Sequence, residues 1–282
     1  SAEGCYFCKG RIISSTPMFP REIVEEGRIS VGEATVFPNL YPFGEYHAVC
    51  VMTEKHYMEL PEISKDIWRD ALQASILFLK RIHEVNREAR YAEIGFNYTP
   101  PAGASIIHPH LQILMDWKPT HGVREEIEAS QRYFQDYGRC YWEDLIYREK
   151  ELKERFIGER GSFAWIASWA PLGNNEVLGI AREPLPSILD IGEEGLVSLV
   201  DGLARVLKGL WEERGVRSLN LAIYSGPIGG GEGFFRVFLR VISRPTLEEF
   251  YTSDRGFMEI LYRETVVQTF PEDVARGLRR YF

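Results

Sequence analysis

The chain has 282 residues, of which 45% are hydrophobic, 26% charged and 13% aromatic, and this composition excludes a disordered or fibrous protein. Its formal net charge is −8, which argues against a general nucleic-acid binder because such proteins need a basic surface. No apolar run approaches the roughly 20 residues of a membrane span, and the N-terminus lacks the apolar core of a secretory signal. We therefore expect neither a nucleic-acid nor a membrane partner.

Cysteine usage and amide content bear on the cellular setting. Four cysteines in a chain of this length do not form a disulfide scaffold, so we expect a reducing, cytoplasmic location. Glutamine and asparagine are scarce whereas charged residues are plentiful, which favours a thermophilic source.

The first half of the chain alternates strands and a helix. Strands are predicted at residues 28–37, 46–52, 91–98 and 108–116, and an amphipathic helix is predicted at 67–89. A turn-rich segment follows the first strand, and a Pro/Gly loop covers residues 99–104. Residues 124–155 are rich in charge and tyrosine, which predicts a helical connection to the second half.

The second half repeats this order. Its predicted elements are strands at 162–170, 176–181, 219–224 and 234–242, a helix at 195–214 and a short helical tail at 272–280. The glycine-rich segment 226–233 fits neither nucleotide-binding glycine motif, so a hairpin loop is favoured.

Two pairs of segments suggest an internal duplication. "YPFGEYHAVCV" aligns with "APLGNNEVLGI", and "GFNYTPPAGAS" aligns with "LAIYSGPIGGG", at offsets of about 126–129 residues. The prediction is an α+β fold of two lobes, each an antiparallel sheet with a packed helix. Residues 1–120 would form the first lobe, 121–158 a helical connector and 159–282 the second lobe.

The strongest chemical signal is the alternation of His108, His110 and Gln112 along one predicted strand. Residues two apart on a strand share a face. Imidazole can attack phosphorus or bind a metal, and a carboxamide can donate a hydrogen bond to a phosphate oxygen. The preceding loop, with Gly103 and Ser105, offers backbone amides and a hydroxyl to an anion. The alternative is a pair of exposed strand histidines without a chemical role.

A second signal is Cys5-x-x-Cys8, which is half of a zinc site. No second such pair exists, so histidines are the candidates for the remaining ligands. The alternatives are two unrelated thiols or a redox pair, although nothing nearby favours the latter. Cys50 lies in an apolar run and is predicted to be core.

The block "GASIIHPHLQ", with "CYFC" upstream, resembles the galactose-1-phosphate uridylyltransferase family of the histidine-triad superfamily, which carries two such lobes per chain. The resemblance extends through "FPNLYPFGEYHAVCVMTEKHYMELPEI" and "GFNYTPPAGAS", and so covers most of residues 5–119. It implies a nucleotidyltransferase that exchanges a nucleoside monophosphate between a nucleotide sugar and a hexose 1-phosphate.

The resemblance also implies residue roles. His110 would be the nucleophile that carries a covalent nucleotidyl group, and Gln112 would stabilise the transferred phosphoryl group. Related hydrolases usually have a third histidine where Gln112 stands, so this residue favours transfer. The substrate-binding residues implied are Asn39 on the nucleoside side and Asn97, Gly103 and Ser105 near the sugar phosphate.

The metal site implied by the resemblance is a single structural zinc per chain. Its ligands would be Cys5, Cys8, His56 and His108, a common closed tetrahedral set. Some family members bind a second metal through histidines in the second half, but this chain has no histidine after His121.

Other features leave the substrate open. The family's nucleoside-contacting asparagine is commonly followed by aspartate, whereas Leu40 stands here, so adenosine is possible as well as uridine. The hexose-reading segment is poorly matched, although Phe257 aligns. The alternatives are a nucleotide-sugar (ADP-glucose) phosphorylase or hydrolase that uses the same histidine, and a zinc-stabilised nucleotide-binding module without turnover. The resemblance alone implies a homodimer.

Overall fold

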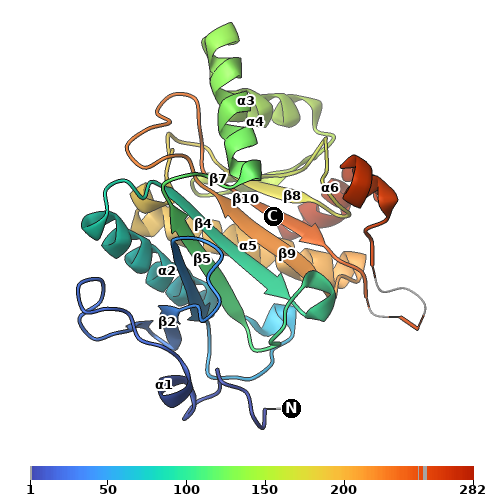
Figure 1. The fold of residues 1–282 in the computed structure, drawn as a ribbon. Helices are drawn as coiled ribbons and strands as arrows, with labels where there is room; N and C mark the ends of the chain where they lie inside the picture. Colours follow the sequence, from blue (N-terminus) through green and yellow to red (C-terminus); the bar gives the residue numbers. More distant parts are fainter. Residues whose placement is uncertain (1, 247, 250–252) are drawn as a thin grey trace.

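A single ten-stranded antiparallel sheet runs through the molecule, in the order β1-β2-β3-β5-β4-β9-β10-β8-β7-β6 (Figure 1). The computed structural model describes residues 2–246, 248–249 and 253–282. In this part of the chain, every helix is too short or too polar to cross a lipid bilayer.

The first half supplies one side of this sheet. Its strands are β1 (Ile29–Val31), β2 (Ala34–Pro38), β3 (Tyr46–Val51), β4 (Tyr91–Tyr98) and β5 (His110–Asp116). The strand predicted at 28–37 is wrong as one element, because Gly32 adopts φ +56° and turns the chain between β1 and β2. The strand predicted from residue 108 begins at His110 instead.

The second half supplies the other side. Its strands are β6 (Phe156–Arg160), β7 (Phe163–Ala167), β8 (Val177–Ala181), β9 (Leu219–Tyr224) and β10 (Phe238–Ser243). Strand β6 was not predicted, and its residues were partly assigned to the connector. The strand predicted from residue 234 starts four residues later, because the amides of Phe234 and Phe235 bond to Gly231 in a turn.

Six α-helices accompany the sheet within the described residues. They are α1 (Ile12–Ser15), α2 (Lys65–Val85), α3 (His121–Tyr137), α4 (Tyr141–Leu152), α5 (Glu193–Arg214) and α6 (Pro271–Leu278). The predicted helical connector is two helices rather than one, because Gly138 ends α3 with a left-handed backbone (φ +67°). Short 3₁₀ turns lie at Leu60–Glu62, Pro100–Ala102, Ile188–Asp190 and Arg279–Tyr281, and a π turn at Met258–Tyr262.

The two halves are duplicates in topology. The strand order β1-β2-β3-β5-β4 recurs as β6-β7-β8-β10-β9, which confirms the internal duplication. The halves share one sheet because β4 pairs with β9, with Gly95 opposite Ala222 and Asn97 opposite Asn220. The division at residues 120 and 159 stays a prediction.

One face of the sheet is covered by the two long helices. In α2 most of the buried residues recur every three or four positions, which places one apolar stripe against the strands. The buried residues are Trp68, Ala71, Leu72, Ala74, Ser75, Ile76, Phe78, Leu79 and Ile82. Ser64 caps this helix by accepting a hydrogen bond from Ile67 N at 3.3 Å. Helix α5 packs beside α2, so both halves share a continuous core (Figure 1).

On the opposite face, apolar side chains pack on the two ends of the sheet. Trp142, Leu145 and Ile146 of α4 pack on the second half-sheet. The N-terminal segment packs Phe7 against Phe37 of the first half-sheet. The strands between these covers, β5, β4, β9 and β10, carry the polar side chains described below.

We expect Gly202→Ala in α5 to destabilise the fold. A Cβ at this position would collide with the fully buried indole of Trp165, and overpacking of this kind costs about 1–3 kcal/mol in the free energy of unfolding. Gly122 in α3 is the matched control because a Cβ there meets open space, so Gly122→Ala should be neutral or stabilise by up to about 1 kcal/mol. Urea unfolding of both variants checks this, and equal effects would contradict it.

Candidate functional site

His110 opens β5 and presents one ring nitrogen to a cavity. Its Nδ1–H donates to the backbone carbonyl of His108 at 2.7 Å, which leaves Nε2 with a free lone pair. Burial lowers the pKa of His110 below its ordinary value of 6.5, although the bond to the carbonyl opposes this shift. The imidazole is therefore neutral near pH 7, as a nitrogen nucleophile must be.

The cavity beside His110 has a volume of about 460 Å³. Four predicted site residues line it: Asn39, Ser105, His110 and Gln112. The other side of the cavity is lined by aromatic side chains of the N-terminal segment and of the end of β2 and the loop after it. They include Tyr6, Phe7, Phe37 and Tyr41. A pocket that is apolar at one end and polar at the other suits a nucleoside monophosphate.

The two remaining predicted residues lie beside each other at the end of β4. Asn97 shares the sheet face of Gln112, because Gln112 pairs with Gly95 and residues two apart on a strand share a face. Gly103 lies in the loop that follows, with φ +88°, and a Cβ there would be 3.9 Å from Asn97 Nδ2. These two residues do not line the His110 cavity.

His47 on β3 is a site residue that the sequence reasoning missed. Its Nε2 lies 3.1 Å from Gln112 Oε1, and because an amide oxygen only accepts, Nε2 carries the proton. The amide of Phe43 lies 3.4 Å from Nδ1, which accepts, while Asn39 Nδ2 lies beside the ring, 3.1 Å from Nε2 and 3.4 Å from Nδ1. His47 therefore orients Gln112 so that its amide NH₂ is free for a ligand. The available signal was a histidine that interrupts an apolar strand.

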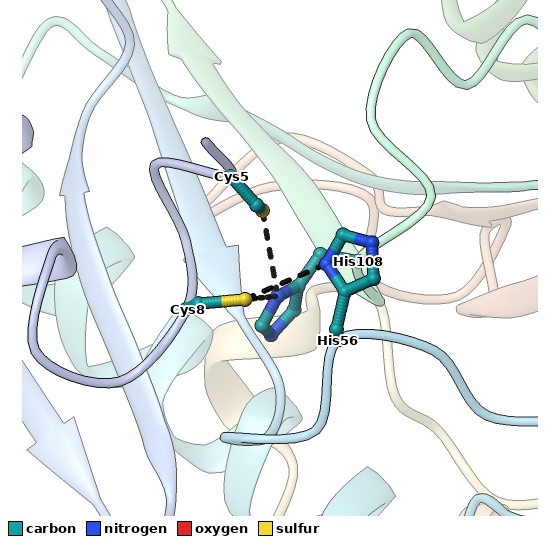
Figure 2. A group of neighbouring side chains, drawn as sticks. All are labelled: Cys5, Cys8, His56 and His108. Atoms are coloured by element: carbon teal, nitrogen blue, oxygen red, sulfur yellow. Dashed lines mark hydrogen bonds between the residues drawn. The ribbon is translucent and has the colours of Figure 1, made fainter. Parts of the chain in front are cut away.

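Two cysteines and two histidines form a cluster (Figure 2), and Tyr6 and Phe7, which stand between the two cysteines in the sequence, line the cavity. One ligand atom from each of Cys5, Cys8, His56 and His108 lies within 4.8 Å of the others. The sulfur-to-nitrogen distances are 3.5 Å for Cys8–His56 and 3.8 Å for both cysteines to His108. A tetrahedral site with ordinary bond lengths has edges of about 3.6 Å between sulfur and nitrogen ligands. The four predicted ligands are thus assembled as a site that could hold a metal ion.

His108 is held in the tautomer that a metal ligand needs. Its Nε2–H donates to the carbonyl of Thr53 at 2.7 Å, so Nδ1, the nitrogen facing the sulfurs, is unprotonated. The side chain is fully buried, and burial lowers the pKa of His108. Phe7 makes edge contacts with the rings of both His108 and His110, so the two imidazoles lie beside the same side chain, although His108 stands before β5 and not on the strand as predicted.

The positions on β10 that correspond to His110 and Gln112 carry other side chains. In the ladders, Gln112 lies between Val49 and Gly95, whereas Arg240 of β10 lies between Leu178 and Ala222. Two residues earlier on each strand, Phe238 stands where the first half has His110. The duplicated strand therefore has no nucleophilic imidazole.

At the position of β10 that corresponds to Gln112, Arg240 forms ion pairs with two glutamates. Arg240 donates to Glu126 at 2.9 Å, and its Nε lies 3.5 Å from a Glu176 carboxylate oxygen. Burial raises the pKa of both carboxyl groups, and Arg240 opposes the shift. This ion-pair cluster ties α3 to β8 and β10.

Among the proteins with similar sequences, those with a named activity are uridylyltransferases and a phosphorylase. The chain is 28% identical to an uncharacterized protein of Archaeoglobus fulgidus, over 98% of this chain and 80% of that protein. It is 24% identical to a galactose-1-phosphate uridylyltransferase of Kluyveromyces lactis (60% of this chain, 47% of that protein). It is equally 24% identical to an ADP-glucose phosphorylase of Arabidopsis thaliana (83% and 64%). The chain thus spans about half to two thirds of the length of these two named relatives.

Solved structures share the fold. An Arabidopsis thaliana ADP-glucose phosphorylase with bound ADP-glucose matches with a TM-score of 0.80 at 21% identity, over 98% of this chain and 89% of that one. A uridylyltransferase mutant matches with a TM-score of 0.81 at 17% identity, over 99% and 93%. No protein-family model matches the chain. The relatives and the shared fold confirm the predicted resemblance to the galactose-1-phosphate uridylyltransferase family.

We expect the stability of His47→Gln to respond to pH differently from that of the wild type. Burial lowers the pKa of His47 in the folded protein, so below about pH 6.5 the unfolded chain takes up a proton that the folded chain does not. The wild type should lose stability relative to the variant as the pH falls from about 7.5 to 5.5, with a constant difference above that window. Urea unfolding across this range measures the difference, and a difference that does not change with pH would contradict the prediction.

Proposed function

We propose that this chain, which has the fold of the uridylyltransferases, transfers a nucleoside monophosphate between a nucleotide sugar and a hexose 1-phosphate through His110. One observation carries the proposal: the Nε2 lone pair of a neutral, buried imidazole faces a cavity of nucleotide size. The named relatives support it, because they are a uridylyltransferase and a nucleotide-sugar phosphorylase.

In the first half of the reaction, Nε2 of His110 attacks the α-phosphorus of the nucleotide sugar. A phosphorus–nitrogen bond forms as the bond from the α-phosphorus to the bridging oxygen breaks, and hexose 1-phosphate leaves with the electron pair. The carbonyl of His108 stabilises the positive charge that the ring acquires, because it already accepts the Nδ1 proton. An incoming hexose 1-phosphate oxygen then attacks the same phosphorus and releases His110.

Gln112 stabilises the phosphoryl group during both steps. Its oxygen is engaged by His47, so its NH₂ group is directed to the cavity and donates to a phosphoryl oxygen without a change of charge. Ser105 adds a hydroxyl from the loop that borders the same cavity. In this proposal Asn97 and Gly103 bind the sugar-phosphate side, while Asn39 binds the nucleoside side.

An ADP-glucose phosphorylase, with inorganic phosphate as acceptor, is the second candidate, and Leu40 favours its adenosine donor. Leu40 lines the cavity beside Asn39 and is 65% exposed, where the resembled family commonly has an aspartate. A leucine offers no acceptor to a uracil ring and is compatible with an adenine. An adenylyl donor with phosphate as acceptor would make the protein an ADP-glucose phosphorylase.

The cysteine–histidine cluster is proposed to hold one structural zinc ion. Two cysteine sulfurs and two histidine nitrogens within 4.8 Å of one another are a donor set that zinc prefers, and four protein ligands leave no open position on a tetrahedral ion. When bound, the metal would brace the segment that leads into β5. His108 would hold it through Nδ1, and the His108 carbonyl still orients the ring of His110. The homodimer, the cytoplasmic location and the thermophilic source stay predictions.

We expect wild-type protein incubated with UDP-glucose or ADP-glucose to gain the mass of one nucleoside monophosphate on His110. His110→Ala should show no adduct and lose nearly all turnover, because it removes the reacting atom itself. His83→Gln is the control: His83 lies on α2, and its Nδ1 bonds to the Ala89 carbonyl, away from the cavity. Intact-mass spectrometry and peptide mapping measure the adduct.

The outcomes of this experiment separate the candidate functions. An adduct on the His110→Ala variant would refute the nucleophile assignment. Wild-type protein that binds nucleotide sugars without an adduct or label exchange would be a binding module. If the adduct forms, competition between galactose 1-phosphate, glucose 1-phosphate, phosphate and water as acceptors distinguishes a transferase from a phosphorylase or hydrolase.

We expect about one zinc ion per chain, because the cluster offers a single four-ligand site. Cys8→Ser should lose most of the metal and melt at a lower temperature, and a chelator should lower the melting temperature of the wild type towards that of the variant. Cys140→Ser is the matched control, since Cys140 is buried elsewhere and its thiol bonds to the Phe234 carbonyl. Metal analysis and calorimetry measure this, and metal-free wild type with unchanged melting would exclude the site.

A further inference from the structure

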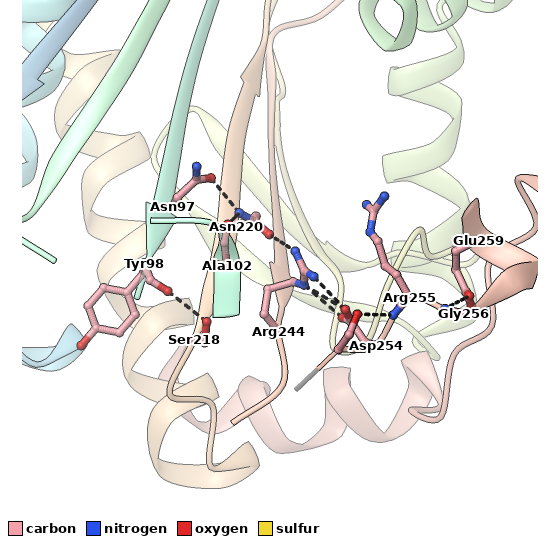
Figure 3. Close-up of polar contacts among 11 residues, drawn as sticks. Asn97, Tyr98, Ala102, Ser218, Asn220, Arg244, Asp254, Arg255, Gly256 and Glu259 are labelled. Atoms are coloured by element: carbon pink, nitrogen blue, oxygen red, sulfur yellow. Dashed lines mark hydrogen bonds and ion pairs between the residues drawn. The ribbon is translucent and has the colours of Figure 1, made fainter. Parts of the chain in front are cut away.

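Asn97 meets the second half of the chain where β4 pairs with β9. Its register partner is Asn220, whose Nδ2 donates to Asn97 Oδ1 at 2.7 Å (Figure 3). The same Nδ2 donates to the carbonyl of Ala102 at 2.8 Å, in the loop that carries Gly103. Asn220 therefore contacts both the side chain and the loop of the proposed sugar-phosphate side.

Arg244, just beyond β10, fixes which way the Asn220 amide is turned. Its Nη1 donates to Asn220 Oδ1 at 2.8 Å. Because a guanidinium only donates, the atom that faces it must be the amide oxygen. With its oxygen held there, Asn220 presents its NH₂ to Asn97. A flipped amide would set two donors together at Arg244 and two acceptors together at Asn97.

Asp254 holds Arg244 in turn. The carboxylate receives Nη2 at 2.8 Å and Nε at 3.0 Å, a two-point contact that fixes the plane of the guanidinium. Both side chains are largely buried, with exposed fractions of 17% and 16%. A two-point pair that is mostly shielded from water is better defined than a surface ion pair.

These contacts determine the direction of the Asn97 side-chain NH₂ group. Its Oδ1 is held by Asn220, so its Nδ2 must face the other way, towards Gly103. Within the described part of the chain, this NH₂ donates to no protein atom, and it is therefore available to a ligand oxygen. We propose that Asp254, Arg244 and Asn220 form a positioning relay by which the second half of the chain orients Asn97 for the sugar phosphate.

The relay acts through Asn97 rather than on the substrate directly. Asn220, Arg244 and Asp254 line a separate cavity of about 670 Å³, whereas the His110 cavity is lined by other residues. This proposal rests on the proposed function, because it assigns to Asn97 a role in binding the nucleotide sugar. The second half-sheet, without a nucleophile of its own, would thus serve the site of the first.

The test measures how fast the nucleotidyl adduct forms in a single turnover, with whichever of UDP-glucose or ADP-glucose loads the wild type. Asn220→Ala should slow adduct formation about ten- to hundredfold, because a misdirected amide spoils the reactive geometry. In an Asn97→Ala background, the same substitution should slow it by less than about threefold, since the effect passes through Asn97. A merely structural role would give equal effects in both backgrounds.

Two further variants control for damage to the sheet. Ser218→Ala removes a buried hydrogen bond to the Tyr98 carbonyl at the same β4–β9 pairing, so it should lower the melting temperature without changing the loading rate. Arg244→Lys keeps one donor for Asn220 but loses the two-point contact, and should load at an intermediate rate.

Distinct outcomes overturn the two proposals. Wild type that forms no adduct would refute the proposed function. Wild type that loads normally, with Asn220→Ala loading equally fast or with its full effect retained in the Asn97→Ala background, would refute the relay alone. Should Asn220→Ala fold poorly, Arg244→Lys with unchanged loading in the folded protein would also refute the relay.

Discussion

The hydrogen bond from His110 Nδ1–H to the carbonyl of His108 is the contact on which the candidate site depends. It sets the tautomer of the proposed nucleophile, and it does so with the backbone of a residue whose ring belongs to the cysteine–histidine cluster. That ring is in turn fixed by the Thr53 carbonyl. The N-terminal segment, the end of β3 and the start of β5 must therefore come together before His110 is directed into the cavity.

Duplication gave the chain two copies of one scaffold, and the copies differ at the positions that correspond to His110 and Gln112. The half-sheets have the same strand order and matching ladders, yet Phe238 and Arg240 stand where the first half has His110 and Gln112. In the first half, the polar side chains that line the cavity are neutral hydrogen-bonding groups. In the second, Arg240 is compensated by the buried carboxylate of Glu176 and the half-buried carboxylate of Glu126. Such a cluster holds α3 to the sheet, and it offers no free nucleophile.

Residues close together in the sequence were the ones that could be predicted. The alternation around His110, the Cys5–Cys8 pair and the apolar stripe of α2 are all local patterns. The structure brings the cysteine pair together with two histidines and buries the stripe of α2, whereas His108 lies before β5 and not on it. His56 was found only through the family resemblance. His47 and Asn220 were missed because their importance depends on which residue faces them across a strand pair, and register is set by the whole sheet. The same holds for β6, whose five residues include only two large apolar side chains, Phe156 and Ile157, and which pairs with β7 at one edge of the sheet.

The pairing of β4 with β9 also bears on how the protein can fail. These strands, of eight and six residues, are internal to the sheet only because each covers the other. If either half unfolded alone, the remaining half would expose a long edge strand with every second side chain apolar, and unpaired edges of this kind recruit other chains. Because of the β4–β9 pairing, a molecule with only one folded half would tend to aggregate. The same pairing favours cooperative unfolding of both halves.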